Sequence, residues 1–342
     1  IAKYPQVNCR IIIGEEVVGV NPKVNNLIRS YRAAVHDILW VIDSNVTVHS
    51  GTLARSVDAL VGGSPPAASP KRIALVHHVP FAVITESRIG SRIEEAFLNT
   101  NHAKMYIAIN TVALESCVMG KSNLYRRSDL ERVNASLKPM AASGVQPGPC
   151  GLPVFGRYLA EDNMIASALW HELGDRHDLS CDIARNVVGN MTLWDYVWRR
   201  VRWIRVRKHM VLSATLLEPF TESVVLSIMC AASLQYLLGV QPWISICMHF
   251  TLWVYVDLDV YASLAGHPLP AAIRWQFMTA WAARELLALP IFLFAIFGSE
   301  VTWRGRRYRV LRNGEVARAE QSRSWFQRLR QPKNYDPINT EL

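Results

Sequence analysis

Two acidic elements stand where a folded chain could use them in catalysis, and the first is Asp43-Ser44-Asn45. It follows directly on the apolar run DILWVID at 37–43, which is typical of a buried strand. Ligands of open parallel sheets bind at the carboxyl ends of strands, and Mg²⁺ is usually held by one or two carboxylates plus phosphates. The position predicts a divalent metal and a diphosphate at Asp43. The alternative is a turn acid that caps a loop.

The second acidic element is Glu161-Asp162-Asn163, which opens a helix expected over 161–174 after a long loop rich in Pro and Gly. An acid at this place can serve as a general base at the edge of a pocket. The alternative is an acid that is simply favoured by the positive end of the helix dipole.

A basic aromatic run, WDYVWRRVRWIRVRK, covers residues 194–208. Arg199 and Arg202 lie three residues apart on one helical face, with Trp203 beside them. Guanidinium groups match phosphate oxygens in two-point geometry, so the pair predicts a phosphate clamp. The alternative is a basic stripe that flanks a membrane, and we interpret 205–208 in that way.

Other polar residues give weaker signals. The lone His102, in NTNHAK, is more often structural than catalytic, and Cys117 has no base placed near it by the sequence. Gly120, in CVMGKSN, permits close approach of the backbone. The pair His77-His78 has no acid or cysteine at metal-ligand spacing, which argues against a metal site there.

The first 200 residues alternate predicted strands with predicted helices. Strands are expected at 9–14, 37–43 and 72–84, and helices at 21–35, 50–62, 91–109 and 161–174. A strand–turn–helix unit is expected at 116–130. This order predicts an α/β domain with a mostly parallel sheet.

The later part of the chain is apolar. Hydrophobic residues make up 50% of the sequence and charged residues 19%, and the net charge of +9 is partly concentrated in 199–208 and 303–312. Three segments approach the length that crosses a bilayer, namely 223–240, 243–264 and 277–298. Segment 209–222 reads as an interfacial helix. The alternative is three buried helices of a soluble domain, because Asp257, Asp259, Arg284 and Glu285 interrupt two of the segments.

The basic runs limit the membrane topology, and the cysteines of the whole chain limit the compartment. Both basic flanks favour the cytoplasmic side, which requires an even number of crossings, whereas three segments are predicted. Either one segment is re-entrant or the tail breaks the positive-inside rule. The six cysteines form no C-x-x-C pair, which excludes a disulfide framework or zinc site and favours a reducing compartment for the soluble part.

Taken in order, these elements resemble the membrane-bound family-2-like glycosyltransferases, and within them the ceramide-glucosylating family 21. The resemblance covers nearly the whole chain. It is carried by NPKVNNL (21–27), the DS doublet (43–44), NTNHAKMY (99–106), Cys117 with its glycine, LAEDN (159–163), RRVRW (199–203), LLEPFTE (216–222) and WRGRRYRV (303–310).

The resemblance implies transfer of glucose from UDP-glucose to the primary hydroxyl of ceramide, with inversion, on the cytosolic face of the Golgi membrane. It implies a GT-A-type nucleotide-sugar domain at 1–198, an interfacial region at 199–222, transmembrane helices at 223–298 and a basic tail at 299–342. A divalent metal (Mg²⁺ or Mn²⁺) and the lipid bilayer are the implied cofactor and partner.

The implied roles follow the matched motifs. Asp162 is the catalytic base, and Asp43 binds the metal. The residues implied to bind the donor are Lys23, Asp43, Asn45, Arg199, Arg202 and Trp203. The residues implied to line the active site are His102, Cys117 and Gly120.

The sequence also departs from the family pattern. The family's first acidic motif, first strands and amino-terminal anchor have no counterpart after Ile1, so we expect the chain on its own to lack activity. The split motif and the Pro-rich insertions are typical of fungal members.

Two other function classes stay open at this level. One is another membrane family-2 transferase with a lipid or polysaccharide acceptor. The other is a basic membrane-associated interaction protein, for which charge at 199–208 matters and residue identity does not. Nucleic-acid binding is the least favoured class, because the positive charge is not spread over a folded face and the apolar carboxyl half has no use in that role.

Overall fold

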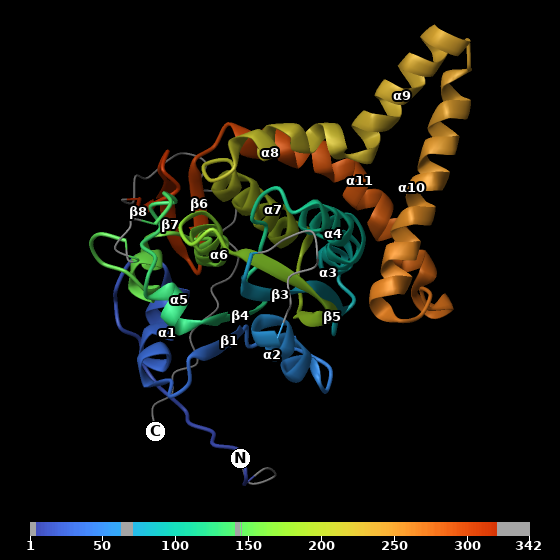
Figure 1. Cartoon of the computed structure of the whole chain (residues 1–342). Coiled ribbons are helices and arrows are strands. Elements are labelled where there is room, and N and C mark those ends of the chain that lie inside the picture. The colour runs from blue at the N-terminus through green and yellow to red at the C-terminus, as the bar shows by residue number, and fades with distance from the viewer. Residues whose placement is uncertain (1–4, 63–70, 141–143, 145, 320–342) are drawn as a thin grey trace.

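The computed structural model describes residues 5–62, 71–140, 144 and 146–319. An α/β body carries two sheets and most of the helices, and a long helical hairpin made by α9 (Ser223–Leu238) and α10 (Pro242–Ala265) projects from it (Figure 1). The helix α11 (Arg274–Ile296) returns from the hairpin along the body, where it packs on α3 (Ile89–Phe97) and α7 (Leu193–Arg207).

The main sheet has five strands in the order β1-β4-β3-β5-β2. Their bounds are β1 Ile38–Ile42, β2 Val46–Thr47, β3 Ile73–Ile84, β4 Ser122–Arg126 and β5 Arg176–Val188. β3 and β5 pair in parallel, whereas β1 with β4, β4 with β3 and β5 with β2 pair antiparallel.

The prediction of a mostly parallel sheet is therefore not confirmed, because the sheet is mixed and only one of its four pairings is parallel. Alternation of strands and helices along a sequence fixes their order but not the direction of each strand. The direction of each strand depends on the end of the sheet at which the preceding helical connection finishes. Here the helical connection between β3 and β4 ends at the place from which β4 runs back beside β3.

The predicted helices of the first 200 residues are present within a few residues of their expected bounds. They are α1 Pro22–Ala33, α2 Thr52–Gly62, α3 Ile89–Phe97, α4 Ala103–Val112 and α6 Glu161–His171. The short α5 Arg127–Leu130 is the helix of the unit expected at 116–130. The start of α1 is fixed by local contacts. The Asn21 side chain accepts hydrogen bonds from the backbone amides of Lys23 and Val24, and Pro22 occupies the first turn.

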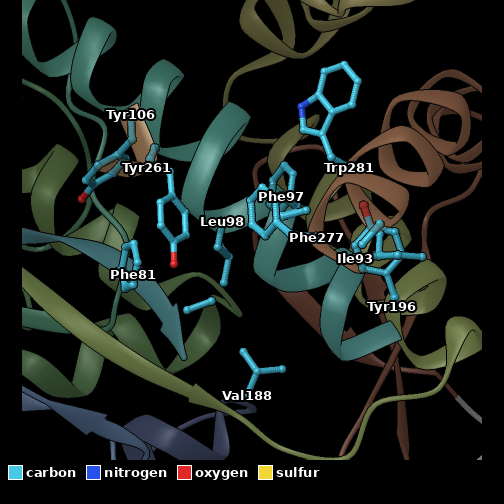
Figure 2. Packing of buried hydrophobic residues seen from close by; sticks show 14 of the residues in the cluster. Phe81, Ile93, Phe97, Leu98, Tyr106, Val188, Tyr196, Tyr261, Phe277 and Trp281 are labelled. Carbon is cyan, nitrogen blue, oxygen red and sulfur yellow. The ribbon is translucent and has the colours of Figure 1, made fainter. Parts of the chain in front are cut away.

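Apolar side chains cover both faces of the sheet. On one face α2 packs its Leu60 against Val76 and Leu124. On the other, α1 and α6 share a core that includes Ile28 and Leu169. A separate and larger cluster joins α3 and α7 to α11 and the later part of α10, so these two apolar segments pack on the body (Figure 2).

One predicted strand is absent from the structure, and one strand of the structure was not predicted. The run at 9–14 is not a strand: Ile11 and Ile13 are exposed, because no strand of the described residues pairs with them. β5 was not predicted, because RHDLSCDIARNVV has neither a continuous apolar run nor a strict alternation. Pairing with strands on both sides makes this segment a strand.

The apolar helices lie close to the predicted segments. They are α9 Ser223–Leu238, α10 Pro242–Ala265 and α11 Arg274–Ile296. By length and composition alone, α10 and the stretch Ala271–Ile296 could each cross a membrane. A third span is available only if α9 is counted together with the preceding helix α8 Leu212–Leu217 and turn Glu218–Thr221, which meet it at a bend of 62°.

The region expected to be a basic tail contains a second sheet. β6 Glu300–Trp303, β7 Arg306–Val310 and β8 Val316–Arg318 form an antiparallel meander. Its inner side chains, among them Tyr308 and Val310, pack against Val206 at the end of α7 (Leu193–Arg207). The rest of the predicted tail, 320–342, lies outside the described residues.

Candidate active site

A pair of lysines holds the carboxylate of Asp43 at the end of β1. Lys23 Nζ lies 2.9 Å from Asp43 Oδ1, and Lys121 Nζ lies 2.9 Å from Asp43 Oδ2. Burial alone would raise the pKa of Asp43, but the two ammonium groups outweigh it and lower that pKa. Asp43 is therefore ionised, and the predicted diphosphate region contains two lysines that can turn toward an anion.

Lys23 also connects Asp43 to the acidic element that opens α6. Its Nζ lies 3.1 Å from Glu161 Oε1 and donates to the carbonyl of Gly120 at 3.0 Å. Burial opposes its charge, but the carboxylates of Glu161, Asp43 and Asp162 outweigh that effect and raise its pKa. Asn21 Nδ2 donates to the other oxygen of Glu161 at 2.7 Å. The NPK motif is thus brought to the LAEDN motif.

Asp162 lies directly against Gly120. A Cβ on residue 120 would stand 2.6 Å from Asp162 Oδ2, so a larger residue would displace the carboxylate. Burial and the neighbouring charge of Glu161 raise the pKa of Asp162 to about 6, against the opposite effect of Lys23. A carboxylate with this pKa is ionised at neutral pH and accepts a proton more readily than an ordinary aspartate.

The described residues do not form a metal site on their own. No group of three or more His, Cys, Asp or Glu side chains is placed to hold an ion in the described part of the chain. Both carboxylate oxygens of Asp43 face ammonium groups. The divalent metal at Asp43 stays a prediction, and no step below depends on it.

Asn45 lies near Asp43 in sequence but its side chain contacts the sheet. Its Nδ2 donates to Asn186 Oδ1 and to the carbonyl of Val187, each at 3.0 Å. These contacts join the loop after β1 to the end of β5, so the amide is used in holding the sheet together.

His102 lies in a π-helical turn, Leu98–His102, between α3 and α4. Such turns are frequent at functional sites because they re-aim a side chain within a helix. The ring of His102 stacks on Tyr106 with centroids 5.6 Å apart and lies 6.0 Å from Trp203. Burial and the nearby charges of Arg200, Arg207 and Arg199 lower the pKa of His102 to about 3, so the ring is neutral. Among the described residues, its Nδ1 has no hydrogen-bond partner.

Cys117 precedes Gly120 on the loop that leads into β4. Burial raises the pKa of its thiol to about 11, with Asp162 acting in the same direction against Arg207. The group is a neutral thiol beside the acid, which fits a lining residue and excludes a thiolate nucleophile.

The two arginines of the RxxRW motif have different surroundings. Arg199 Nε lies 2.8 Å from Oε1 of the buried Glu94, and its guanidinium lies 5.0 Å from the Trp203 ring. For Arg202 no carboxylate partner is found within the described residues, and its guanidinium lies 5.9 Å from the centre of the Trp303 ring. Burial, and then the charge of Arg199, lower the pKa of Arg202 to about 10, which leaves it charged. Arg202 is the better placed of the two to take an anionic ligand.

The motif also reaches the Asp43 end of the site. Burial lowers the pKa of Lys121 against the attraction of Asp43, and the charge of Arg199 adds to the lowering. The α7 arginine is therefore near enough to the lysine pair for its charge to be felt there.

The remaining cations of 199–208 contact the protein. Arg200 stacks on Phe97, and Arg207 pairs with Glu218. Arg205 and Lys208 donate to carbonyl groups at and beyond the end of α11. These contacts are specific in geometry, which argues against a basic stripe that acts by charge alone.

Sequence reasoning missed two groups of this site. Lys121 follows Gly120 in the quoted motif CVMGKSN, and Glu161 precedes Asp162 in LAEDN, so both stood inside recognised motifs. What the sequence lacked was the partner: Lys121 binds an acid 78 residues away. A lysine and an acid at such separation give no local pattern.

Comparison with known proteins gives a consistent result. The family described as glycosyl transferase family 21 matches residues 1–316. A protein named ceramide glucosyltransferase from Komagataella phaffii is 38% identical over 91% of this chain and 72% of its own length. Proteins of the same name from Candida albicans and Pyricularia oryzae are 31% and 34% identical, over 91% and 86% of this chain and 77% and 67% of their own lengths.

Proposed function

The chain belongs to glycosyl transferase family 21, and on that premise we propose that it transfers glucose to ceramide and makes glucosylceramide. The observation that carries the proposal from the structure is Asp162: a half-buried carboxylate with a pKa of about 6, adjacent to Gly120 and near the lysine that holds Asp43.

The proposed reaction is one in-line displacement with a single base. Asp162 takes the proton from the primary hydroxyl of ceramide as the hydroxyl oxygen attacks the anomeric carbon of UDP-glucose. The bond from that carbon to the diphosphate oxygen breaks, and UDP leaves with the bonding electrons. One displacement inverts the anomeric carbon, so no second carboxylate is required as a nucleophile.

The departing diphosphate gains negative charge, and fixed cations would stabilise it in a partly buried site. Arg202, Lys121 and Lys23 supply that charge in the proposal. Lys23 and Lys121 would turn from Asp43 toward the phosphates, and Arg202 would contact them directly. Arg199 would position the helix through Glu94, and Trp203 would support His102.

A lipid acceptor fits the place of this site in the chain. The RxxRW motif lies on α7, which leads through α8 and one bend into the apolar hairpin. Ceramide leaves a bilayer only at a high cost in free energy, so a transferase acting on it needs its base near the membrane. We propose that the reaction takes place on the cytosolic face of the Golgi membrane.

The test is glucosyl transfer in membranes. We would join the amino-terminal segment of the Komagataella phaffii relative to this chain and express it in cells that lack glucosylceramide. Isolated membranes would receive UDP-glucose and ceramide, and the product would be measured by mass spectrometry. The chain without the added segment, the intact relative and Asp162→Asn would be assayed in parallel.

Glucosylceramide formation that the Asn variant abolishes, at equal amounts of membrane-inserted protein, is the expected result. A membrane-inserted protein that makes none while it consumes another sugar nucleotide or another acceptor would overturn the ceramide assignment. Adding and chelating Mg²⁺ or Mn²⁺ in the same assay tests the predicted metal: unchanged activity in chelator would contradict it.

A further inference from the structure

The helix α11 is long enough and apolar enough to cross a bilayer, yet it contacts the body along its whole length. It has 23 residues, about 35 Å at 1.5 Å per residue. A crossing helix of that length would place its two ends on opposite sides of the membrane. The contacts at its start, middle and end decide whether it does so.

The start of α11 is packed on the main sheet. Phe277 is fully buried and lies 5.4 Å from Tyr261 of α10, whose ring lies 5.5 Å from Phe81 of β3 (Figure 2). The preceding turn of α10 is held in the same way, because Lys104 of α4 binds Asp257 at 2.7 Å. The chain is therefore back at the body before α11 begins.

The middle of α11 carries a buried ion cluster, which we call the Arg284 cluster: Glu222, Ser223, Arg284 and Glu285. Arg284 binds Glu222 through contacts of 2.9 and 2.6 Å and Glu285 at 2.5 Å, and Ser223 donates to Glu285. Glu222 is the residue immediately before α9. The midpoint of α11 thus lies at the level where the chain enters the hairpin.

The end of α11 is bound by α7. Lys208 donates to the carbonyls of Ile296 and Gly298 at 2.7 and 2.6 Å, and Arg205 donates to that of Glu300 at 2.6 Å. Cations at a helix C-terminus satisfy its free carbonyl groups. The second sheet then packs beside Leu159 and Ala160, next to the acidic element of the site.

The hairpin of α9 and α10 is less buried against the body than α11. Only 11% of the apolar window of α10 is buried, against 39% for that of α11, and the hairpin projects away from the body (Figure 1). α11 keeps an apolar stripe on its outer face, whose exposed members are Trp275, Leu286, Leu293 and Phe294, and Phe297 directly after the helix is exposed as well.

We propose that α11 does not cross the bilayer but lies along its surface, as the side of the catalytic body that rests on the lipid. The partner of its outer stripe is the bilayer interface, which suits aromatic and aliphatic side chains beside a polar body. The inserted part is the hairpin of α9 and α10. Both ends of α11, and with them both basic runs at 199–208 and 303–312, are on the side of Asp162, as the positive-inside rule favours.

The first test places a short epitope in the Asn313–Gly314 turn, with a reference epitope at Pro147–Gly148 of the body in a second variant. Sealed vesicles would be treated with a protease from outside. The two epitopes are expected to be digested together or protected together in every preparation. Digestion of one with protection of the other would overturn the proposal. Transferase activity of each tagged protein, compared with the untagged one, checks that the fold is retained.

A second test needs no insertion and compares two charged substitutions. Leu286→Arg places a charge on the outer face at the middle of α11, and Met248→Arg places one on an exposed position of α10. Arginine at the centre of a crossing helix opposes insertion, whereas at an interface its head reaches water. We expect Met248→Arg to lower the membrane-inserted fraction about tenfold or more and Leu286→Arg to lower it less than twofold. An equal loss for both would contradict the in-plane position of α11.

Discussion

The charged groups around Lys23 and those of the Arg284 cluster use the same residue types in different surroundings. The Lys23 group comprises Lys23, Asp43, Lys121, Glu161 and Asp162. The side chains of Lys23 and Asp43 keep 23% and 25% of their surface exposed, whereas those of Arg284 and Glu285 keep 2% and 3%. In the Arg284 cluster every oxygen of both carboxylates has a donor. In the Lys23 group Asp162 carries a raised pKa beside a second acid.

The difference indicates how to distinguish a catalytic from a structural charge in this chain. A closed and fully paired cluster holds elements together, because breaking it leaves an uncompensated charge in the interior. An open group that crowds like charges is costly to the fold and keeps a proton acceptor near neutral pH. Each prediction below acts on one side of this comparison.

The largest effect is expected for Asp162→Asn. Loss of the base should reduce kcat about 10³-fold. Stability should rise at the same time by on the order of 1–3 kcal/mol, because the folded protein no longer holds an ionised carboxylate against burial and Glu161. Glucosyl transfer and thermal unfolding in detergent would measure the two effects. A variant that loses both activity and stability would make Asp162 a structural acid.

Arg284→Met should have the next largest effect, on folding. It leaves Glu222 and Glu285 without their cation, and breaking a buried pair costs about 3–5 kcal/mol. We expect a loss of membrane-inserted protein and a lower thermal midpoint. The triple variant that adds Glu222→Gln and Glu285→Gln should recover much of the loss. Full stability of the single variant would contradict the role of the cluster.

Arg202→Lys tests geometry against charge. A lysine keeps the charge but cannot offer a two-point fork, and a lost hydrogen bond to a charged group costs about 1.5–3 kcal/mol. We expect transfer to fall about 10- to 100-fold with the amount of protein unchanged. Arg205→Lys is the matched control, because Arg205 binds backbone carbonyls, and it should fall less than threefold. Equal activity of Arg202→Lys and the unchanged protein would favour a basic interaction surface.

The pH dependence is the smallest effect. The base works when ionised, so kcat/KM should fall as the pH drops through about 6, by tenfold per unit below it. The stability gain from Asp162→Asn should change with pH in the same direction: a raised folded pKa of Asp162 favours the folded state at low pH, and this advantage of the unchanged protein is lost as the pH rises through 6. The stabilisation by Asn should thus be present at pH 7.5 and absent near pH 4. A midpoint near pH 4 for kcat/KM would remove Asp162 from the role of base.

The sequence determined the order and nature of most elements. Helical periodicity located α1, α2 and α6, helped at α1 by the Asn21 cap, and apolar length located α9, α10 and α11 to within a few residues. These are local properties, since each turn of a helix depends on residues three or four apart. The sequence also contained every motif from which the candidate site is built.

Strand direction and contacts between distant residues could not be predicted in the same way. β5 became a strand through its neighbours, and the sheet is mixed because the connecting helices set where β4 starts. Lys121 pairs with Asp43 across 78 residues, and Arg284 pairs with Glu222 across 62. No local pattern encodes such pairs.

The two sets of charges show this division most clearly. From the sequence alone, Arg284 and Glu285 are interruptions of an apolar segment, and Asp162 is one acid at a helix start. The residue types determined which groups can carry charge. Tertiary structure decided which of these groups are buried with partners and which stay accessible to a ligand, because burial and pairing depend on segments that meet only when the chain folds.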